Sequence, residues 1–121
     1  MRSSSKKLSP SLKKQLEDVF AQTVSDLKDF READVFLKDF FTKSEYELFT
    51  KRLAVAYWLS KKRSYENIKV NLKVSSATIA AVRLMLDKKG LQSAMKKIEA
   101  EEWASQWSKK IKKVLGARAQ I

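Results

Sequence analysis

Apolar residues recur at intervals of three and four along most of the chain, which is the spacing of helices that each bury one face. The first such stretch follows Ser9 and Pro10, a capping residue and a proline that suits the first helical turn, and predicts a helix over about 10 to 30. A dense aromatic group predicts a short second helix over about 33 to 41. Val and Thr do not alternate with polar residues, so we expect an all-α fold of about six helices.

The middle of the chain carries clear helix-start signals. Thr42-Lys43-Ser44-Glu45 matches a capping box and predicts a third helix from near 43 to near 60. That helix is apolar around much of its circumference, so we expect it at the centre of the core. Ser64 predicts the start of a fourth helix, and Ser75 or Ser76 the start of a fifth over about 76 to 86.

The last apolar stripe predicts an amphipathic helix over about 91 to 115, after Lys88 to Gly90 end the fifth. The stripe shifts around the helix near Glu101, which indicates a bend or a change of partner there. Trp103 and Trp107 share this stripe, so we expect them in the core and not as stacking platforms for bases.

Residues 64–86 have the internal spacing of a helix-turn-helix. Aliphatic residues from Ile68 to Val82 recur where the two helices would pack together. Ala77, Ala80 and Ala81 lie on the second helix, and small side chains let a backbone approach base edges closely. The same alanines also suit a helix for their propensity alone, and any two-helix corner with buried aliphatics has a similar pattern.

Composition narrows the classes of function. The 121 residues, 44% hydrophobic, suit one helical domain over 9–121 after a disordered basic arm over 1–8. The chain has no histidine and no cysteine, and it has no Gly-rich phosphate loop, so we expect neither an enzyme nor a metal or other cofactor. No apolar run reaches the roughly 20 residues needed to span a bilayer. We therefore expect a cytoplasmic protein without membrane contact.

The net charge of +12 is unevenly distributed. Residues 12–59 carry eight basic and nine acidic side chains, whereas residues 60–89 carry eight basic and only two acidic ones. A basic segment that coincides with the helix-turn-helix favours a located face for double-stranded DNA, because Lys and Arg displace condensed counterions from phosphates. The alternative is a basic surface that serves solubility.

Three stretches also carry a family resemblance: Lys51-Arg52-Leu53-Ala54-Val55-Ala56, Lys62-Arg63-Ser64-Tyr65-Glu66-Asn67-Ile68 and Val74-Ser75-Ser76-Ala77-Thr78-Ile79. Together they resemble the Trp repressor superfamily, particularly its YerC/YecD-like branch. The resemblance spans about 42 to 86 and is strongest over 74–79. It implies an intertwined homodimer that presents two reading heads to a palindromic operator.

The resemblance also implies roles for individual residues. Lys69 and Thr78 would contact phosphates, while Ser76, Ala77 and Ala80 would lie against base edges. We add Lys73 and Arg83 from their charge and position. Ser75 and Ala81 complete the candidate DNA-binding set.

Two departures from the family pattern change what we expect. Lys73 stands where the family's turn commonly has glycine, so this turn must adopt a non-glycine conformation or accept strain. The founding repressor holds its tryptophan corepressor between two arginines, and only Arg52 has a matching position, the second falling on Ala81. Arg83 points roughly 200° further around the helix and cannot substitute. We therefore expect no response to tryptophan.

The first hypothesis is a sequence-specific transcriptional regulator, and the resemblance favours a repressor. Two others stay open: a protein-interaction adaptor that uses the same helical corner, and a nonspecific nucleic-acid-binding protein. The sequence leaves the operator, the regulated genes and any small-molecule effector undefined.

Overall fold

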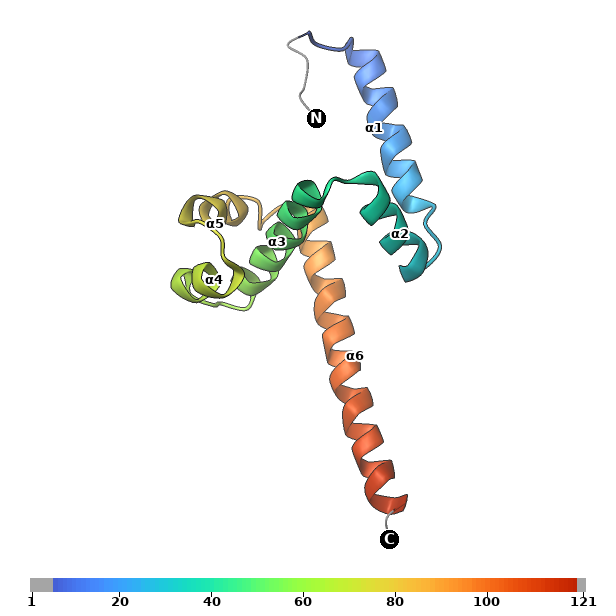
Figure 1. The fold of residues 1–121 in the computed structure, drawn as a ribbon, viewed down its shortest axis with the longest axis vertical. Helices are drawn as coiled ribbons and strands as arrows, with labels where there is room; N and C mark the ends of the chain where they lie inside the picture. Colours follow the sequence, from blue (N-terminus) through green and yellow to red (C-terminus); the bar gives the residue numbers. More distant parts are fainter. Residues whose placement is uncertain (1–5, 120–121) are drawn as a thin grey trace. The chain divides into compact units, whose positions relative to one another are not determined.

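The computed structural model describes residues 6–119, without the side chains of Trp107 and residues 117–119. This part of the chain is all-α, as predicted, and contains no strand (Figure 1). The described part of the chain forms two compact units, which divide between Tyr46 and Glu47. The helices are α1 (Pro10–Ser25), α2 (Phe30–Phe40), α3 (Lys43–Ser60), α4 (Tyr65–Leu72), α5 (Ser76–Arg83) and α6 (Lys89–Ala119).

Four helices begin at the predicted caps. The side chains of Ser9, Ser64 and Ser75 each accept a hydrogen bond from the amide three residues later, at 3.1 to 3.2 Å. Thr42 and Glu45 form both bonds of the capping box, at 2.9 and 3.1 Å. The Thr42 amide donates to the Glu45 carboxylate, and this bond, together with a smaller contribution from the Thr42 side chain, holds the pKa of that carboxyl below its ordinary value. Local capping chemistry therefore sets where these helices start.

Two helices end earlier than the apolar spacing predicts. α1 stops at Ser25 and not near 30, because Asp29 caps α2 by accepting from the Glu32 amide at 2.9 Å. The second helix consequently begins at Phe30, before the predicted 33. α5 stops at Arg83 and not at 86, and a tight turn with a 2.9 Å bond from the Met85 amide to the Val82 carbonyl follows.

α6 is longer than predicted and starts earlier. It runs from Lys89 to Ala119, so Gly90 lies inside it and does not end the fifth helix. Gly90 has no positive φ, so this position needs no glycine conformation. The helix is continuous through Glu101, and the expected shift of its apolar stripe therefore takes place without a break in the helix (Figure 1).

The two halves of α6 present their apolar residues on nearly opposite faces. Met95 and Ile98 pack into the core of residues 47–121. Ile111 and Val114 lie 16 residues further along, which places each about 160° around the helix from its counterpart. Both are 53% exposed, and Trp103 is 61% exposed. The expectation that Trp103 lies in the core is wrong for the chain by itself, and that for Trp107 lies outside the described side chains.

The core of residues 47–121 lies where the second half of α3 meets α4, α5 and the start of α6. Its buried residues are Val55, Ala56, Leu59, Ile68, Ile79, Val82 and Met95. Two polar contacts outside this core involve α6: Lys61, the residue after α3, pairs with Glu99 at 3.2 Å, and the Tyr57 hydroxyl of α3 contacts Glu102. The first half of α3 is less buried than we expected, because Leu48 and Phe49 remain exposed.

The other unit, residues 1–46, buries none of its described residues. Phe40 contacts Phe20 of α1 at 5.7 Å and Phe36 of its own helix at 5.2 Å between ring centroids. The apolar residues of α1 nevertheless stay open to solvent: Leu12, Leu16, Val19, Phe20 and Val24 are 42% to 60% exposed. This unit therefore offers a continuous apolar surface along α1.

Three expectations are not tested by these features. The disordered arm over 1–8 falls mostly outside the described residues, although Lys6, Lys7 and Leu8 precede α1 without helical structure. A single domain over 9–121 and the homodimer stay predictions.

Within residues 6–119, every helix is too short or too polar to cross a bilayer.

Candidate nucleic-acid interface

α4, its turn and α5 form the predicted helix-turn-helix (Figure 1). Ile68 of α4 and Ile79 and Val82 of α5 are buried between the helices and α3. Leu72 and Val74 pack against them in part. The predicted inter-helix core is thus confirmed, and it fixes how α5 is rotated about its own axis.

The rotation of α5 leaves its small residues open to solvent. Ser76, Ala77 and Ala80 are exposed on the side away from the buried Ile79 and Val82. Ser75 caps the helix in front of them, and its hydroxyl lies 3.0 Å from that of Thr78, which is half-buried. A face with no large side chains at the start of a helix permits close approach to a flat or grooved surface.

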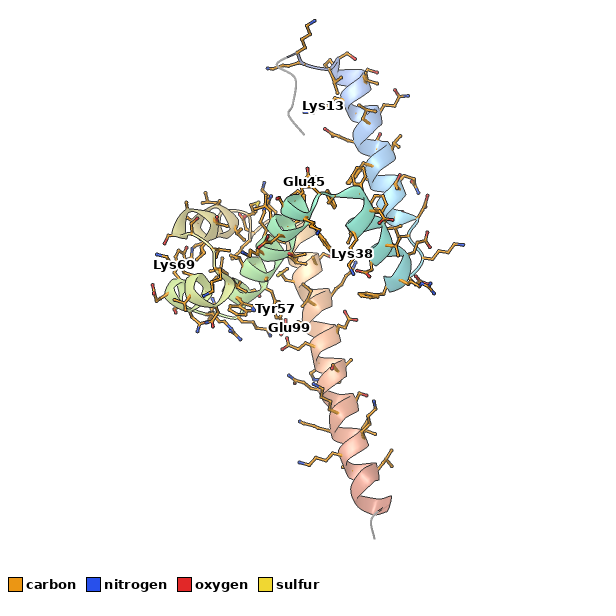
Figure 2. All side chains as sticks on the ribbon, in the orientation of Figure 1. Lys13, Lys38, Glu45, Tyr57, Lys69 and Glu99 are labelled. Carbon is orange, nitrogen blue, oxygen red and sulfur yellow. The ribbon has the colours of Figure 1, made fainter. Side chains whose placement is uncertain are left out.

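The remaining candidates lie at the margins of this face. Ala81 and Arg83 are exposed at its two sides, and Lys73 is exposed in the turn. Lys69 is exposed on α4, where Figure 2 labels it. The nine candidate residues therefore all belong to one helix-turn-helix and avoid its core. Sequence reasoning missed Leu84, which is 80% exposed just beyond α5 and four residues after Ala80.

The turn between α4 and α5 adopts the conformation that favours glycine. Lys73 has φ 55° and ψ 49°, in the left-handed region, so the expected strain is present and not avoided. The ammonium of Lys51 on α3 reaches the Lys73 carbonyl at 3.5 Å and also pairs with Glu47 at 3.1 Å. A cation near the carbonyl end of α4 complements the helix dipole, so Lys51 braces the turn.

The segment before α4 is held by a second left-handed residue. Lys62 has φ 65°, and the amide of Arg63 donates to the Trp58 carbonyl at 3.1 Å. The Arg63 guanidinium lies 4.0 Å from the centroid of the Trp58 ring, which is a cation–π contact. This arrangement positions the start of α4 against the end of α3.

A cavity of about 510 Å³ lies beside Arg52. Apolar side chains from α3, α5 and α6, among them Leu53, Val82 and Leu91, line most of it. The Arg52 guanidinium lies 3.2 Å from the sulfur of Met85, and Lys88 is the other cation on the lining. Ala81, which stands at the position of the founding repressor's second arginine, does not line this cavity. No cation therefore replaces that arginine at this position.

The described residues hold no cluster of three or more acidic side chains able to bind a metal ion.

The comparisons with known proteins give one match: the family model described as Trp repressor protein, over residues 14–101. Neither the curated proteins nor the solved structures give a match. The matched span contains the helix-turn-helix and all of its candidate contact residues. The chain belongs to the Trp repressor family, a family of helix-turn-helix DNA-binding regulators of transcription.

Proposed function

We propose that this protein is a sequence-specific repressor that reads a palindromic DNA site as a homodimer, and that it lies in the YerC/YecD-like branch of its superfamily. One observation carries the proposal: the capped start of α5 exposes Ser76, Ala77 and Ala80 beside the cations Lys69 and Lys73. The small residues admit base edges, and the cations face phosphates. A cytoplasmic location follows from this function.

The exposed face of α1 supports the homodimer. Five apolar residues at helical spacing lie open along α1, and monomeric proteins rarely expose contiguous apolar patches of that kind. A second copy covers this face and supplies the second reading head. Two-fold symmetry in the protein then requires two-fold symmetry in the operator.

Selection of bound sequences from a random DNA pool tests the specificity. We expect a palindromic consensus with two half-sites. Ala77→Asp and Ala80→Glu are expected to abolish binding to that consensus, because each places a carboxylate against the DNA. Ala100→Glu is the matched control, since Ala100 is an exposed alanine on α6. Undiminished binding by the α5 variants refutes the recognition face.

A salt titration separates this function from the adaptor hypothesis. The logarithm of the DNA-binding constant should fall linearly with the logarithm of salt concentration, because phosphate contacts release counterions. An apolar protein interface shows no such slope. A slope without a consensus sequence identifies a nonspecific nucleic-acid-binding protein instead.

Sedimentation equilibrium tests the homodimer. We expect a mass of twice the 14.0 kDa of one chain. Val19→Asp should return the protein to a monomer, since Val19 is 60% exposed in a single chain and contributes little to its own fold. A monomeric wild-type protein at micromolar concentration contradicts the dimer.

We also propose that the protein does not respond to tryptophan. Arg52 remains at the apolar cavity, but Ala81 supplies no second guanidinium fork. The affinity for the selected DNA should therefore be the same with and without millimolar tryptophan. A tenfold change in affinity refutes this part of the proposal.

A further inference from the structure

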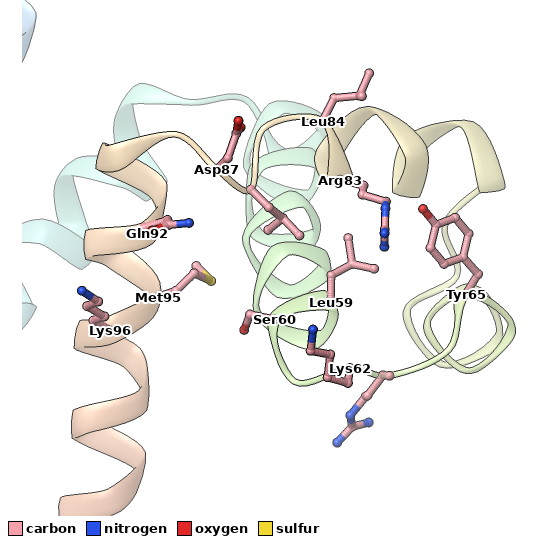
Figure 3. Close-up of a pocket in the computed structure, with 12 residues that line it drawn as sticks. Leu59, Ser60, Lys62, Tyr65, Arg83, Leu84, Asp87, Gln92, Met95 and Lys96 are labelled. Atoms are coloured by element: carbon pink, nitrogen blue, oxygen red, sulfur yellow. The ribbon is translucent and has the colours of Figure 1, made fainter.

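A second cavity, of about 840 Å³, lies beside Arg83 and shares no lining residue with the cavity beside Arg52 (Figure 3). We call it the Arg83 groove. Its apolar lining includes Leu59 at the end of α3, Leu86 after α5 and Met95 on α6. Figure 3 shows Arg83 and Tyr65 on one side of Leu59, and Gln92 and Met95 on the other. The groove is thus bounded by the end of α3, both helices of the helix-turn-helix and α6.

Four cations surround this apolar lining: Lys62, Arg63, Arg83 and Lys96. Asp87 is the one carboxylate among the lining residues. Arg63 is engaged by Trp58, as described above. Among residues 6–119, no ion pair or hydrogen bond of the side chains of Lys62, Arg83 or Lys96 is found. The groove therefore carries an uncompensated positive potential above an apolar base.

We propose that the Arg83 groove binds a small organic anion: a carboxylate or phosphate group attached to an apolar body. The volume lies in the range of small-molecule sites, which combine mostly apolar walls with a few polar groups that orient the ligand. The apolar body contacts Leu59, Leu86 and Met95. The anionic group pairs with Arg83, and Lys62 is drawn nearer to Arg83 than Lys96 is (Figure 3).

The site is distinct from the cavity beside Arg52. None of the residues that line the Arg83 groove lines the other cavity. Adjacent residues at the end of α5 line different cavities. Val82 and Met85 line the cavity beside Arg52, whereas Arg83 and Leu84 line the Arg83 groove. Occupancy of the groove can consequently be measured separately from any ligand at Arg52.

Three naphthalene probes test the binding chemistry. We expect 1-naphthoate and 1-naphthyl phosphate to bind saturably, and uncharged 1-naphthol to bind at least about tenfold more weakly. The tighter of the two anions identifies the preferred head group. Amide chemical shifts in a ¹⁵N-labelled protein should change at Ser60, Leu84 and Gln92, which line the groove. Equal binding of 1-naphthol, or shifts confined to Phe49 and Leu91, overturns the proposal.

Charge variants test the residues. Lys62→Gln should weaken 1-naphthoate about threefold, and Lys62→Gln with Lys96→Gln about tenfold, as expected for exposed cations. Lys97→Gln is the matched control, because Lys97 is an exposed neighbour outside the groove. Salt should weaken 1-naphthoate binding to the wild-type protein, a test that needs no folded variant. Equal losses in Lys62→Gln and Lys97→Gln overturn the assignment.

A consequence for DNA binding rests on the proposed function. Arg83 belongs both to the groove and to the margin of the α5 face, so an anion that pairs with it competes with a DNA phosphate. Saturating 1-naphthoate should lower the DNA affinity about threefold, and DNA should lower the affinity for 1-naphthoate by the same factor. If the protein binds no DNA, the proposed function fails while the probe titrations still test the groove. If DNA binds with unchanged affinity, the competition is refuted.

Discussion

Replacing Lys73 by glycine should stabilise the protein while weakening its contact with DNA. Lys73 holds φ 55° and ψ 49°, where an L-residue is disfavoured by roughly 1–2 kcal/mol relative to the right-handed region. Glycine removes that penalty but raises the entropy of the unfolded chain, which costs about 0.5–1 kcal/mol. The difference is a net stabilisation of about 0.5–1 kcal/mol.

The matched control is Lys73→Ala. Alanine removes the same charge and side chain but keeps a Cβ atom in the left-handed conformation, so it retains the strain. The bond from Lys51 to the backbone carbonyl of residue 73 is available in both variants. The free energy of unfolding of Lys73→Gly should therefore exceed that of Lys73→Ala by about 1 kcal/mol.

Urea unfolding followed by circular dichroism measures this difference, at one fixed protein concentration for all variants. The corresponding increase in Tm is roughly 4 °C. Both variants should bind the selected DNA more weakly and reduce the salt slope by about one, because each removes one proposed phosphate contact. If glycine and alanine unfold at the same urea concentration, the turn is not strained and the reasoning fails.

Three further predictions concern the core, the capping box and α6. Ile79→Ala should destabilise the protein by about 2–5 kcal/mol in urea unfolding, whereas Val70→Ala should change it by less than about 0.5 kcal/mol, because Ile79 is fully buried and Val70 is 55% exposed. The lowered pKa of Glu45 means that the capping box stabilises the fold above the ordinary glutamate pKa of about 4.3 and loses this contribution as the pH falls through the lower folded value. Glu45→Gln, which removes the titrating carboxyl, should make stability less dependent on pH in that range, and an unchanged pH profile of unfolding contradicts the assigned cause. A chain that ends after residue 103 should unfold within about 0.5 kcal/mol of the full chain, because the described side chains beyond it are exposed; a larger loss in urea unfolding shows that they contribute to the core.

The starts of four described helices, α1, α3, α4 and α5, were predictable from the sequence because their caps are local, whereas the starts of α2 and α6 were predicted too late. Ser64 and Ser75 each sit three residues before the amide they bind, so a short window contains the whole signal. Helix ends were harder, since apolar spacing continues through Leu27 although Asp29 already caps the next helix. Gly90 was misread for a related reason: glycine marks a helix end only where φ is positive.

The recognition face was predictable because helical periodicity places the apolar Ile79 and Val82 on one side of α5 and Ala77 and Ala80 on another. The first pair is buried and the second pair is exposed. The Arg83 groove was not, because its lining joins Leu59, Arg83 and Met95 from three helices. Lys51 was also missed, since its contact with the Lys73 carbonyl spans 22 positions of the sequence. Contacts of that kind depend on tertiary packing and leave no periodic signal.

α6 is uninterrupted between Ile98 and Ile111. The number of residues between them therefore determines the direction in which Ile111 and Val114 face relative to the core. Deleting one residue between Ile98 and Trp103 turns everything beyond it by about 100° and draws it in by about 1.5 Å. Deleting seven residues turns it by only about 20°. A deletion of seven residues in this segment therefore nearly preserves the direction in which Ile111 and Val114 face, whereas a deletion of one residue does not. Point substitutions leave the number of residues, and hence this direction, unchanged.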